Sequence, residues 1–191
     1  MKQDTAQQIL DAAQLMVRNR GYSAFSYADI AKEVGIRKAS IHYHFPSKED
    51  LVKELVIRYR DNLVRQCQTI EQQLITPQEQ FKRFISLYRN GLEENQICLC
   101  GMLTADFVVL SPEIQEELKT FFAAAELWLT RLLQRGSEAK VWQCAQSCEL
   151  EAKSIIAMLQ GAQLLSRAAD NSAETFDQVT GDFFKDKIES E

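Results

Sequence analysis

The sequence predicts an all-α protein, and three observations lead to this fold class. Only 7 Gly and 3 Pro occur among the 191 residues, so sharp turns are few and long helices are favoured over a many-stranded sheet. Apolar residues recur at helical spacing along the chain. The composition of 46% hydrophobic and 26% charged residues is that of a globular protein with a core, which excludes a disordered chain, a collagen and a disulfide scaffold. The length suits one domain, or one with a small appendage.

The first helix is expected at residues 5–20. Thr5 and Gln8 form a capping-box pattern, and one apolar face follows them. Gly21 comes directly after this face, where a residue of positive φ can close a helix.

Two shorter helices follow. The second, at residues 27–34, begins after Ser26, whose capping partner is Asp29. A tight turn at residues 35–37 leads to a third helix at residues 38–45. Two short helices joined by a Gly-containing turn are a helix-turn-helix candidate, in which the second helix enters the major groove of DNA.

The outward side chains of that recognition helix are a cation, short hydrogen-bonding groups, an aromatic hydroxyl and an imidazole. This set suits base edges and phosphates. Helix pairs with a Gly turn are also common in other all-α proteins, so a solvated face on a small bundle is the alternative. The outward residues are Lys38, Ala39, Ser40, Tyr43 and His44.

Small, apolar and aromatic positions recur in a characteristic order through these three helices. They are Ile9-Leu-Asp-Ala-Ala13, Arg20-Gly-Tyr22, Asp29-Ile-Ala31, Val34-Gly-Ile36 and Ser40-Ile-His-Tyr-His-Phe-Pro-Ser-Lys-Glu-Asp-Leu51. With this order, residues 5–51 resemble the amino-terminal DNA-binding domain of TetR-family transcriptional regulators. The resemblance implies a three-helix head whose third helix reads the operator.

Carried over by position, the resemblance implies DNA contacts for eight residues. Bases or adjacent phosphates would be contacted by Lys38, Ala39, Ser40, Tyr43 and His44, and the DNA backbone by Ser26, Tyr27 and Lys48. Arg37 departs from the family pattern, since a Ser or Thr helix cap is common there, and it adds a cation instead. His42 stands where Tyr is commoner. For His42 and His44, packing against the fourth helix is the alternative role.

Charge is distributed unevenly along the chain. Residues 1–60 hold ten Lys and Arg against seven Asp and Glu, a net +3, whereas residues 61–191 hold 12 against 20, a net −8. Binding to a polyanion depends on a local patch rather than on the net charge of −5. The amino-terminal third is therefore the part suited to DNA.

A helix of more than twenty residues is predicted to begin after the capping box at Ser47 and Asp50. Its apolar stripe continues without Gly or Pro as far as Pro77, so no flexible linker follows the head. Such a helix can act as a lever, because moving one end of a stiff rod moves the other. We expect a helix-turn-helix DNA-binding domain at residues 1–48 and a helical effector-binding and dimerisation domain at residues 49–191.

Further helices are predicted in this body, at residues 78–95, 101–109, 112–135 and 149–169, with a last one capped at residues 171–174. The segments 98–107 and 111–114 also resemble one branch of TetR-like regulators, although this match indicates a scaffold and no particular effector. The charged residues 180–191 are expected to fray.

Aromatic and methionine side chains of the body are candidates for an effector pocket that favours an apolar or aromatic small molecule. The alternative for each of them is an ordinary place in the core. Tyr88 and Trp128 can also offer hydrogen bonds. The candidates are Phe84, Tyr88, Met102, Phe107, Phe121, Trp128 and Met158.

The amino terminus shows no apolar secretory signal, and no apolar run is long enough to span a membrane, so we expect a cytoplasmic protein without a membrane partner. The number of cysteines is odd, which in such a chain predicts free thiols. Cys98 and Cys100, beside a helix start, are either reactive thiols or small buried residues. Neither a metal nor a cofactor is expected, because both His lie in the head and the spacing of Cys144 and Cys148 is not that of a zinc site.

The last two long helices are expected to form the interface of a homodimer, as a four-helix bundle with a symmetry mate. The residues assigned to it are Ile155, Ile156, Leu159, Gly161, Ala162, Leu165, Ala168, Phe176, Val179 and Phe183. The sequence thus predicts a homodimeric repressor that a small-molecule effector releases from a palindromic operator. The alternatives are a redox- or electrophile-sensing repressor that uses Cys98 and Cys100, and a scaffolding protein without DNA binding. An enzyme is not expected, since no catalytic triad, phosphate loop or metal spacing occurs.

Overall fold

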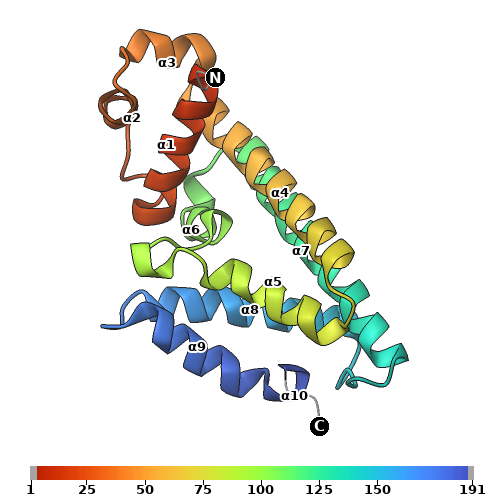
Figure 1. The fold of residues 1–191 in the computed structure, drawn as a ribbon. Helices are drawn as coiled ribbons and strands as arrows, with labels where there is room; N and C mark the ends of the chain where they lie inside the picture. The colour runs from red at the N-terminus through yellow and green to blue at the C-terminus, as the bar shows by residue number, and fades with distance from the viewer. Residues whose placement is uncertain (1–3, 189–191) are drawn as a thin grey trace. The chain divides into compact units, whose positions relative to one another are not determined.

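The computed structural model describes residues 4–188, and within this range it contains helices and no strand (Figure 1). The all-α fold class is therefore confirmed. The chain divides into two compact units. Unit 1 comprises the chain up to Arg60 together with Cys98–Phe121, and unit 2 comprises the remainder. Two long helices, α4 (Lys48–Gln73) and α7 (Pro112–Glu138), supply residues to both units. The functional boundary at residue 48 stays a prediction.

Unit 1 contains the three head helices, α1 (Thr5–Arg20), α2 (Tyr27–Val34) and α3 (Lys38–His44), within one residue of the predicted bounds. Their fully buried side chains are Ile9, Ala13, Val17, Ile30 and Ile41. The predicted cap of the first helix is wrong by one residue, because the Asp4 carboxylate accepts the Ala6 N–H at 3.4 Å. The capping box of α2 is present as predicted.

Helix α6 (Leu99–Ala105) packs beside α1 within unit 1. The sequence predicted one continuous helix at residues 101–109, whereas the chain leaves α6 at Asp106 and forms a separate 3₁₀ turn at Phe107–Val109. Burial explains the earlier start, since Leu99 and Leu103 are both completely inaccessible to solvent.

Unit 2 is built from α5 (Pro77–Arg89), the 3₁₀ turn Leu92–Glu94, α8 (Cys148–Ser166), α9 (Ser172–Phe183) and α10 (Lys185–Ile188). Helices α8 and α9 lie side by side, and α5 packs against α8 (Figure 1). The helix predicted at residues 78–95 ends at Arg89 instead, because Gly91 adopts a left-handed φ of 93° that an α-helix cannot continue.

The expectation that residues 180–191 fray is wrong for residues 180–188. Helix α9 continues to Phe183 and α10 follows, because the buried Phe184 ring packs edge-on against Phe81 at 5.2 Å between centroids. Residues 189–191 lie outside the described residues.

The connection from α7 to α8 is fixed by Trp142. Its indole N–H donates to the Leu133 carbonyl at 2.9 Å, and a Cβ at Gly136 would come within 2.1 Å of the indole ring. Only glycine fits at that position. Beyond this turn, Cys144 and Cys148 form a disulfide, so the expectation that all five cysteines are free thiols is wrong.

Candidate functional sites

The outward face of α3 is the candidate nucleic-acid interface. Tyr43 is 84% exposed, and Lys38 and Ala39 are exposed beside it. His44 is half-buried, with its ring edge-on to Tyr43 at 5.2 Å between centroids. Ser40 is half-buried as well. The predicted base-reading residues therefore share one helix, and only Ile41 of α3 is buried.

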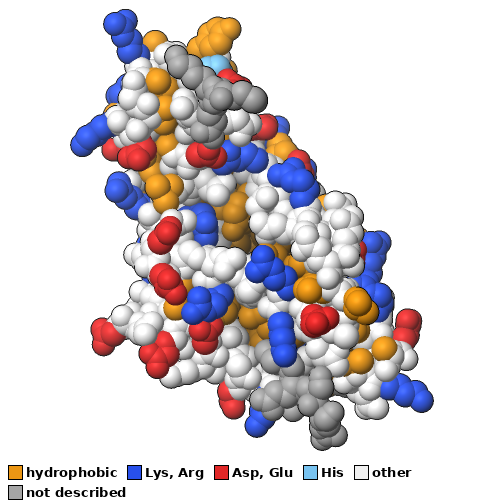
Figure 2. Space-filling view, in the orientation of Figure 1, with side chains coloured by type: hydrophobic (Ala, Val, Ile, Leu, Met, Phe, Trp, Pro, Cys, Tyr) orange, Lys and Arg blue, Asp and Glu red, His pale blue; other side chains and the backbone are white. Residues whose placement is uncertain are grey.

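Exposed cations lie close to this face in the sequence. Arg37 makes no side-chain cap to α3, and its side chain is exposed, as is that of Lys32 near the end of α2. Figure 2 shows Lys and Arg side chains and a protruding hydrophobic side chain on the surface over α2 and α3. This surface combines cations, which suit phosphates, with an aromatic hydroxyl, which can reach phosphates or base edges.

The sequence predicted contacts with the DNA backbone for Ser26, Tyr27 and Lys48. In the structure, the polar side-chain atoms of these residues form hydrogen bonds with other parts of the chain. The Ser26 hydroxyl donates to Asp29 at 2.7 Å. The Tyr27 hydroxyl donates to the carbonyls of Phe45 and Ser47, and burial raises the pKa of Tyr27 to about 12. Its ring also contacts His42, whose Nδ1 lies 3.2 Å from a backbone oxygen four residues on.

Lys48 is tied down most tightly. Its ammonium donates to the carbonyls of Tyr22 at 2.7 Å and Phe25 at 2.6 Å, and lies over both rings at 4.5 and 4.2 Å. Burial lowers the pKa of Lys48. A lysine held this way fixes the start of α4 against the segment between α1 and α2. Its contact with DNA stays a prediction, while its role in positioning the head is visible in the structure.

A carboxylate at the end of α6 also holds this corner of unit 1. Asp106 accepts the backbone N–H of Tyr22 at 3.1 Å, directly after Gly21, whose φ is 83°. The sequence gives no signal for this bond, because its partners lie 84 positions apart. It connects the segment before the helix-turn-helix to α6.

Cys98 and Cys100 lie in the core of unit 1. Both are buried, and desolvation raises the pKa of the Cys100 thiol well above its ordinary value. A buried thiol of raised pKa provides little of the thiolate that reacts with oxidants and electrophiles. The environment favours the interpretation of these residues as small apolar core residues.

The candidate effector residues fall into both units. In unit 1, Phe121 is buried against Tyr59 at 5.6 Å, while Met102 and Phe107 are half-buried. In unit 2, Trp128 stacks on Phe84 at 5.0 Å, Tyr88 lies 5.6 Å from the same ring, and Met158 is half-buried. The buried Trp128 Nε1 finds no hydrogen-bond partner among residues 4–188.

The residues predicted for the dimer interface divide into a buried set and an exposed set. Buried within the chain itself are Ile155, Ile156, Leu159, Ala162 and Phe176. The remainder face solvent with large exposed fractions, 71% for Leu165 and 62% for Phe183. The exposed apolar and small positions in the second half of α8 are Ala157, Gly161, Leu164 and Leu165, and Ala168 is exposed just after the helix ends. Their spacing places them on one face of the helix.

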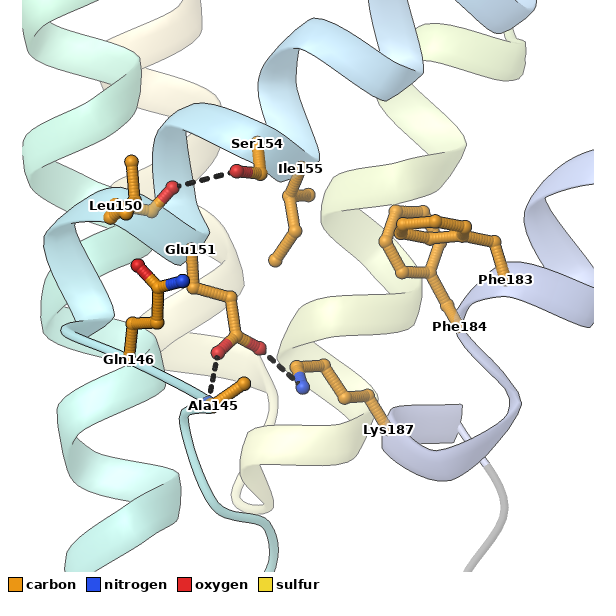
Figure 3. A pocket seen from close by; sticks show the side chains of 9 residues that line it. All are labelled: Ala145, Gln146, Leu150, Glu151, Ser154, Ile155, Phe183, Phe184 and Lys187. Carbon is orange, nitrogen blue, oxygen red and sulfur yellow. Dashed lines mark hydrogen bonds and ion pairs between the residues drawn. The ribbon is translucent and has the colours of Figure 1, made fainter.

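A hollow of about 360 Å³ opens in unit 2 between the first turns of α8 and the end of α9 (Figure 3). None of the seven predicted effector residues lines it. Leu150, Ile155 and Phe184 are among its apolar walls, and the carboxylate of Glu151 forms an ion pair with Lys187 at 2.5 Å. Sequence reasoning missed this hollow because Lys187 belongs to the segment expected to fray.

Among residues 4–188, no group of three or more His, Cys, Asp and Glu is placed to hold a metal ion. No helix of this part of the chain is long and apolar enough to cross a membrane.

Comparison with known proteins places these features in context. The pattern of bacterial regulatory proteins of the tetR family matches residues 9–55. A TetR-family transcriptional regulator from Agrobacterium tumefaciens shares 34% identity and a TM-score of 0.88, covering 94% of this chain and 95% of that one. A TetR transcriptional regulator from Legionella pneumophila shares 33% identity and the same TM-score, covering 99% and 100%. The HTH-type transcriptional regulator LmrA of Bacillus subtilis is 28% identical over 88% of this chain and 89% of its own.

Proposed function

Because the chain belongs to the TetR family of transcriptional regulators, we propose that it is a homodimeric repressor that leaves its operator DNA when a small molecule binds the body. The observation that carries DNA recognition is the outward face of α3, where Tyr43 is 84% exposed next to Lys38. This large aromatic side chain on a seven-residue helix touches the ring of the adjacent His44 and leaves most of its surface free for contact with DNA. Repression, rather than activation, is supported by IcaR, a negative transcriptional regulator from Staphylococcus aureus that is 27% identical over 138 residues.

The proposed contacts follow from exposure. Base edges and adjacent phosphates are contacted by the outward face of α3, and Arg37 adds a further cation. The residues of this face are Lys38, Ala39, Ser40, Tyr43 and His44. Ser26 and Tyr27 support the turn. Lys48 holds α4 in position through its two carbonyl contacts, so its effect on DNA binding is in large part indirect.

The proposed dimer forms through α8 and α9. Several of their apolar side chains point outward in the single chain. Leu164, Leu165, Val179 and Phe183 are each between 43% and 71% exposed. Small residues at positions 157, 161 and 168 allow another helix to approach closely. Two heads related by a twofold axis would occupy successive major grooves, about 34 to 36 Å apart.

The effector of this proposal is an aromatic small molecule that carries a hydrogen-bond acceptor. The stacked pair of Phe84 and Trp128 offers apolar surface, and the buried Trp128 N–H, without a partner in residues 4–188, offers a donor. To release DNA, the effector must bind the DNA-incompetent conformation more tightly than the competent one. Helix α4 can transmit the change, because it supplies residues to both units without a break.

The decisive test is fluorescence anisotropy on DNA from upstream of the protein's own gene, with Tyr43→Ala as the variant. Loss of the Tyr43 contacts is expected to lower operator affinity by about 10- to 100-fold, which corresponds to about 1–3 kcal/mol. Ile75→Ala is the matched control, since Ile75 is 93% exposed but lies after α4 in unit 2. Equal operator affinity of both variants, or binding that competitor DNA abolishes, would disprove the assignment of α3.

A further inference from the structure

The connection between α7 and α8 carries a bonded cysteine pair. Cys144 and Cys148 are joined with 5.5 Å between their Cα atoms, and both are half-buried. The three other cysteines, Cys67, Cys98 and Cys100, are buried. The bonded pair is therefore the cysteine site that small reagents can reach.

The ring that this disulfide closes is short, since only three residues separate the two cysteines. A cross-link over so few residues removes little conformational freedom from the unfolded chain, so it adds less stability than one over a long loop. Cys148 is also the first residue of α8, a helix already capped by the Ser147 hydroxyl, which accepts the Leu150 N–H. The helix start therefore has its own stabilising contact when the disulfide is open.

The ring forms one wall of the hollow in unit 2. Ala145, inside the ring, donates its N–H to Glu151 at 3.0 Å, and the other oxygen of that carboxylate pairs with Lys187 (Figure 3). Ala145 and Gln146 line the hollow opposite Phe184. The disulfide thus holds a wall that one carboxylate links to α10.

We propose that Cys144 and Cys148 are a reversible thiol–disulfide switch that responds to small-molecule thiols and opens the wall of this hollow on reduction. A thiolate such as that of glutathione attacks one sulfur, the S–S bond breaks, and the other cysteine leaves as a thiolate that takes up a proton. A second glutathione thiolate attacks the mixed disulfide and releases the first cysteine together with oxidised glutathione. Each cycle thus consumes two glutathione molecules and yields two protein thiols. The proposal depends on unit 2 alone and does not require DNA binding.

The first test equilibrates the native protein in glutathione buffers of graded ratio, traps free thiols by alkylation and digests the protein with trypsin. Cleavage after Lys140 and Lys153 releases residues 141–153, which contain both cysteines of the pair and none of the other three. This peptide is expected to pass from the disulfide to the doubly alkylated form within the buffer range. A pair that stays bonded until the protein is denatured, or stays reduced in every buffer, would overturn the proposal.

The second test asks whether the wall opens. Trp142 lies two residues before Cys144, so a Trp128→Phe variant leaves one indole as a fluorescent reporter of the connection. Reduction is expected to shift Trp142 emission and to speed exchange of the Ala145 amide hydrogen by at least about tenfold. Cys144→Ser with Cys148→Ser should show no response to the buffers, while Cys98→Ser with Cys100→Ser should respond like the parent. An unchanged Ala145 amide after complete reduction would show that the disulfide does not control the wall.

Discussion

Helices α3 and α6 are both seven residues long and both belong to unit 1, yet most of α3 is accessible to solvent and much of α6 is buried. In α3 only Ile41 is buried, and a tyrosine and a lysine face solvent. In α6 three residues are buried, among them Leu103 and Cys100, which are fully inaccessible. The chemically distinctive residues of α3 face solvent, while those of α6 are removed from reagents.

The difference shows that residue type alone does not locate a functional site in this fold. A cysteine pair and a histidine–tyrosine pair are equally suggestive in the sequence. Burial separates them, because a side chain must reach its partner before its chemistry matters. Four predictions test this contrast between the exposed helix α3 and the buried helix α6.

The largest effect is expected for Leu103→Ala in α6. Removal of a fully buried leucine should lower the free energy of unfolding by about 2–5 kcal/mol. Urea unfolding measures it, with Tyr43→Ala on α3 as the comparison. That variant removes a larger side chain but should change stability by less than about 0.5 kcal/mol, because the ring is exposed. Similar losses in both variants would break the contrast.

A smaller effect is expected from Cys100 at alkaline pH. Burial raises the pKa of this thiol in the folded state, so above about pH 9 the unfolded state loses a proton that the folded state keeps. Stability contributed by this difference is full below pH 9 and falls as pH rises, by up to about 1.4 kcal/mol per pH unit.

Between pH 8 and 11, the free energy of unfolding should therefore fall less steeply with pH in Cys100→Ala than in the parent. Cys67, whose pKa is raised to about 12, contributes with the same sign and remains in the variant. An unchanged slope in Cys100→Ala would mean that the thiol is not shielded from solvent as the structure describes.

Asp106→Asn sharpens the comparison at the end of α6. The amide keeps an acceptor for the Tyr22 N–H but loses the charge, so thermal unfolding should show a loss of about 1 kcal/mol. Asp170→Asn, an exposed position of unit 2, is the control and should leave stability unchanged. A loss of the same size in both variants would indicate a general charge effect in place of a specific bond.

The smallest effect is expected for Lys38→Ala on α3. Removing one phosphate contact should reduce the slope of log affinity against log salt concentration by about 1 in magnitude, and should leave the free energy of unfolding unchanged. Lys82→Ala, an exposed lysine on α5, provides the reference. If both variants keep the parent's salt slope, Lys38 makes no phosphate contact.

The sequence predicted the head to within a residue because its signals are local. Capping residues such as Ser26 and Asp29, and apolar spacing such as Ile9 and Ala13, act within one turn of helix. Contacts between distant segments were not predictable. Nothing near Tyr22 indicates that Asp106 accepts its N–H, and nothing in the charged end of the chain indicates that Phe184 is buried.

The candidate site shows the same limit. The face of α3 followed from helical periodicity, whereas Tyr27 and Lys48 proved to be held by carbonyls of residues that only the folded chain brings near. The bond between Cys144 and Cys148 was not predicted, because an odd number of cysteines favours free thiols.

The packing of Trp142 over Gly136 also restricts how this corner of the fold can change over evolution. Any side chain at position 136 collides with the indole, and loss of the indole removes the hydrogen bond that it donates to the Leu133 carbonyl. Neither position can be altered alone without a defect that the other must relieve. In related chains that keep this turn between α7 and α8, the two positions should therefore vary together, and a residue larger than glycine at one should accompany a smaller ring at the other.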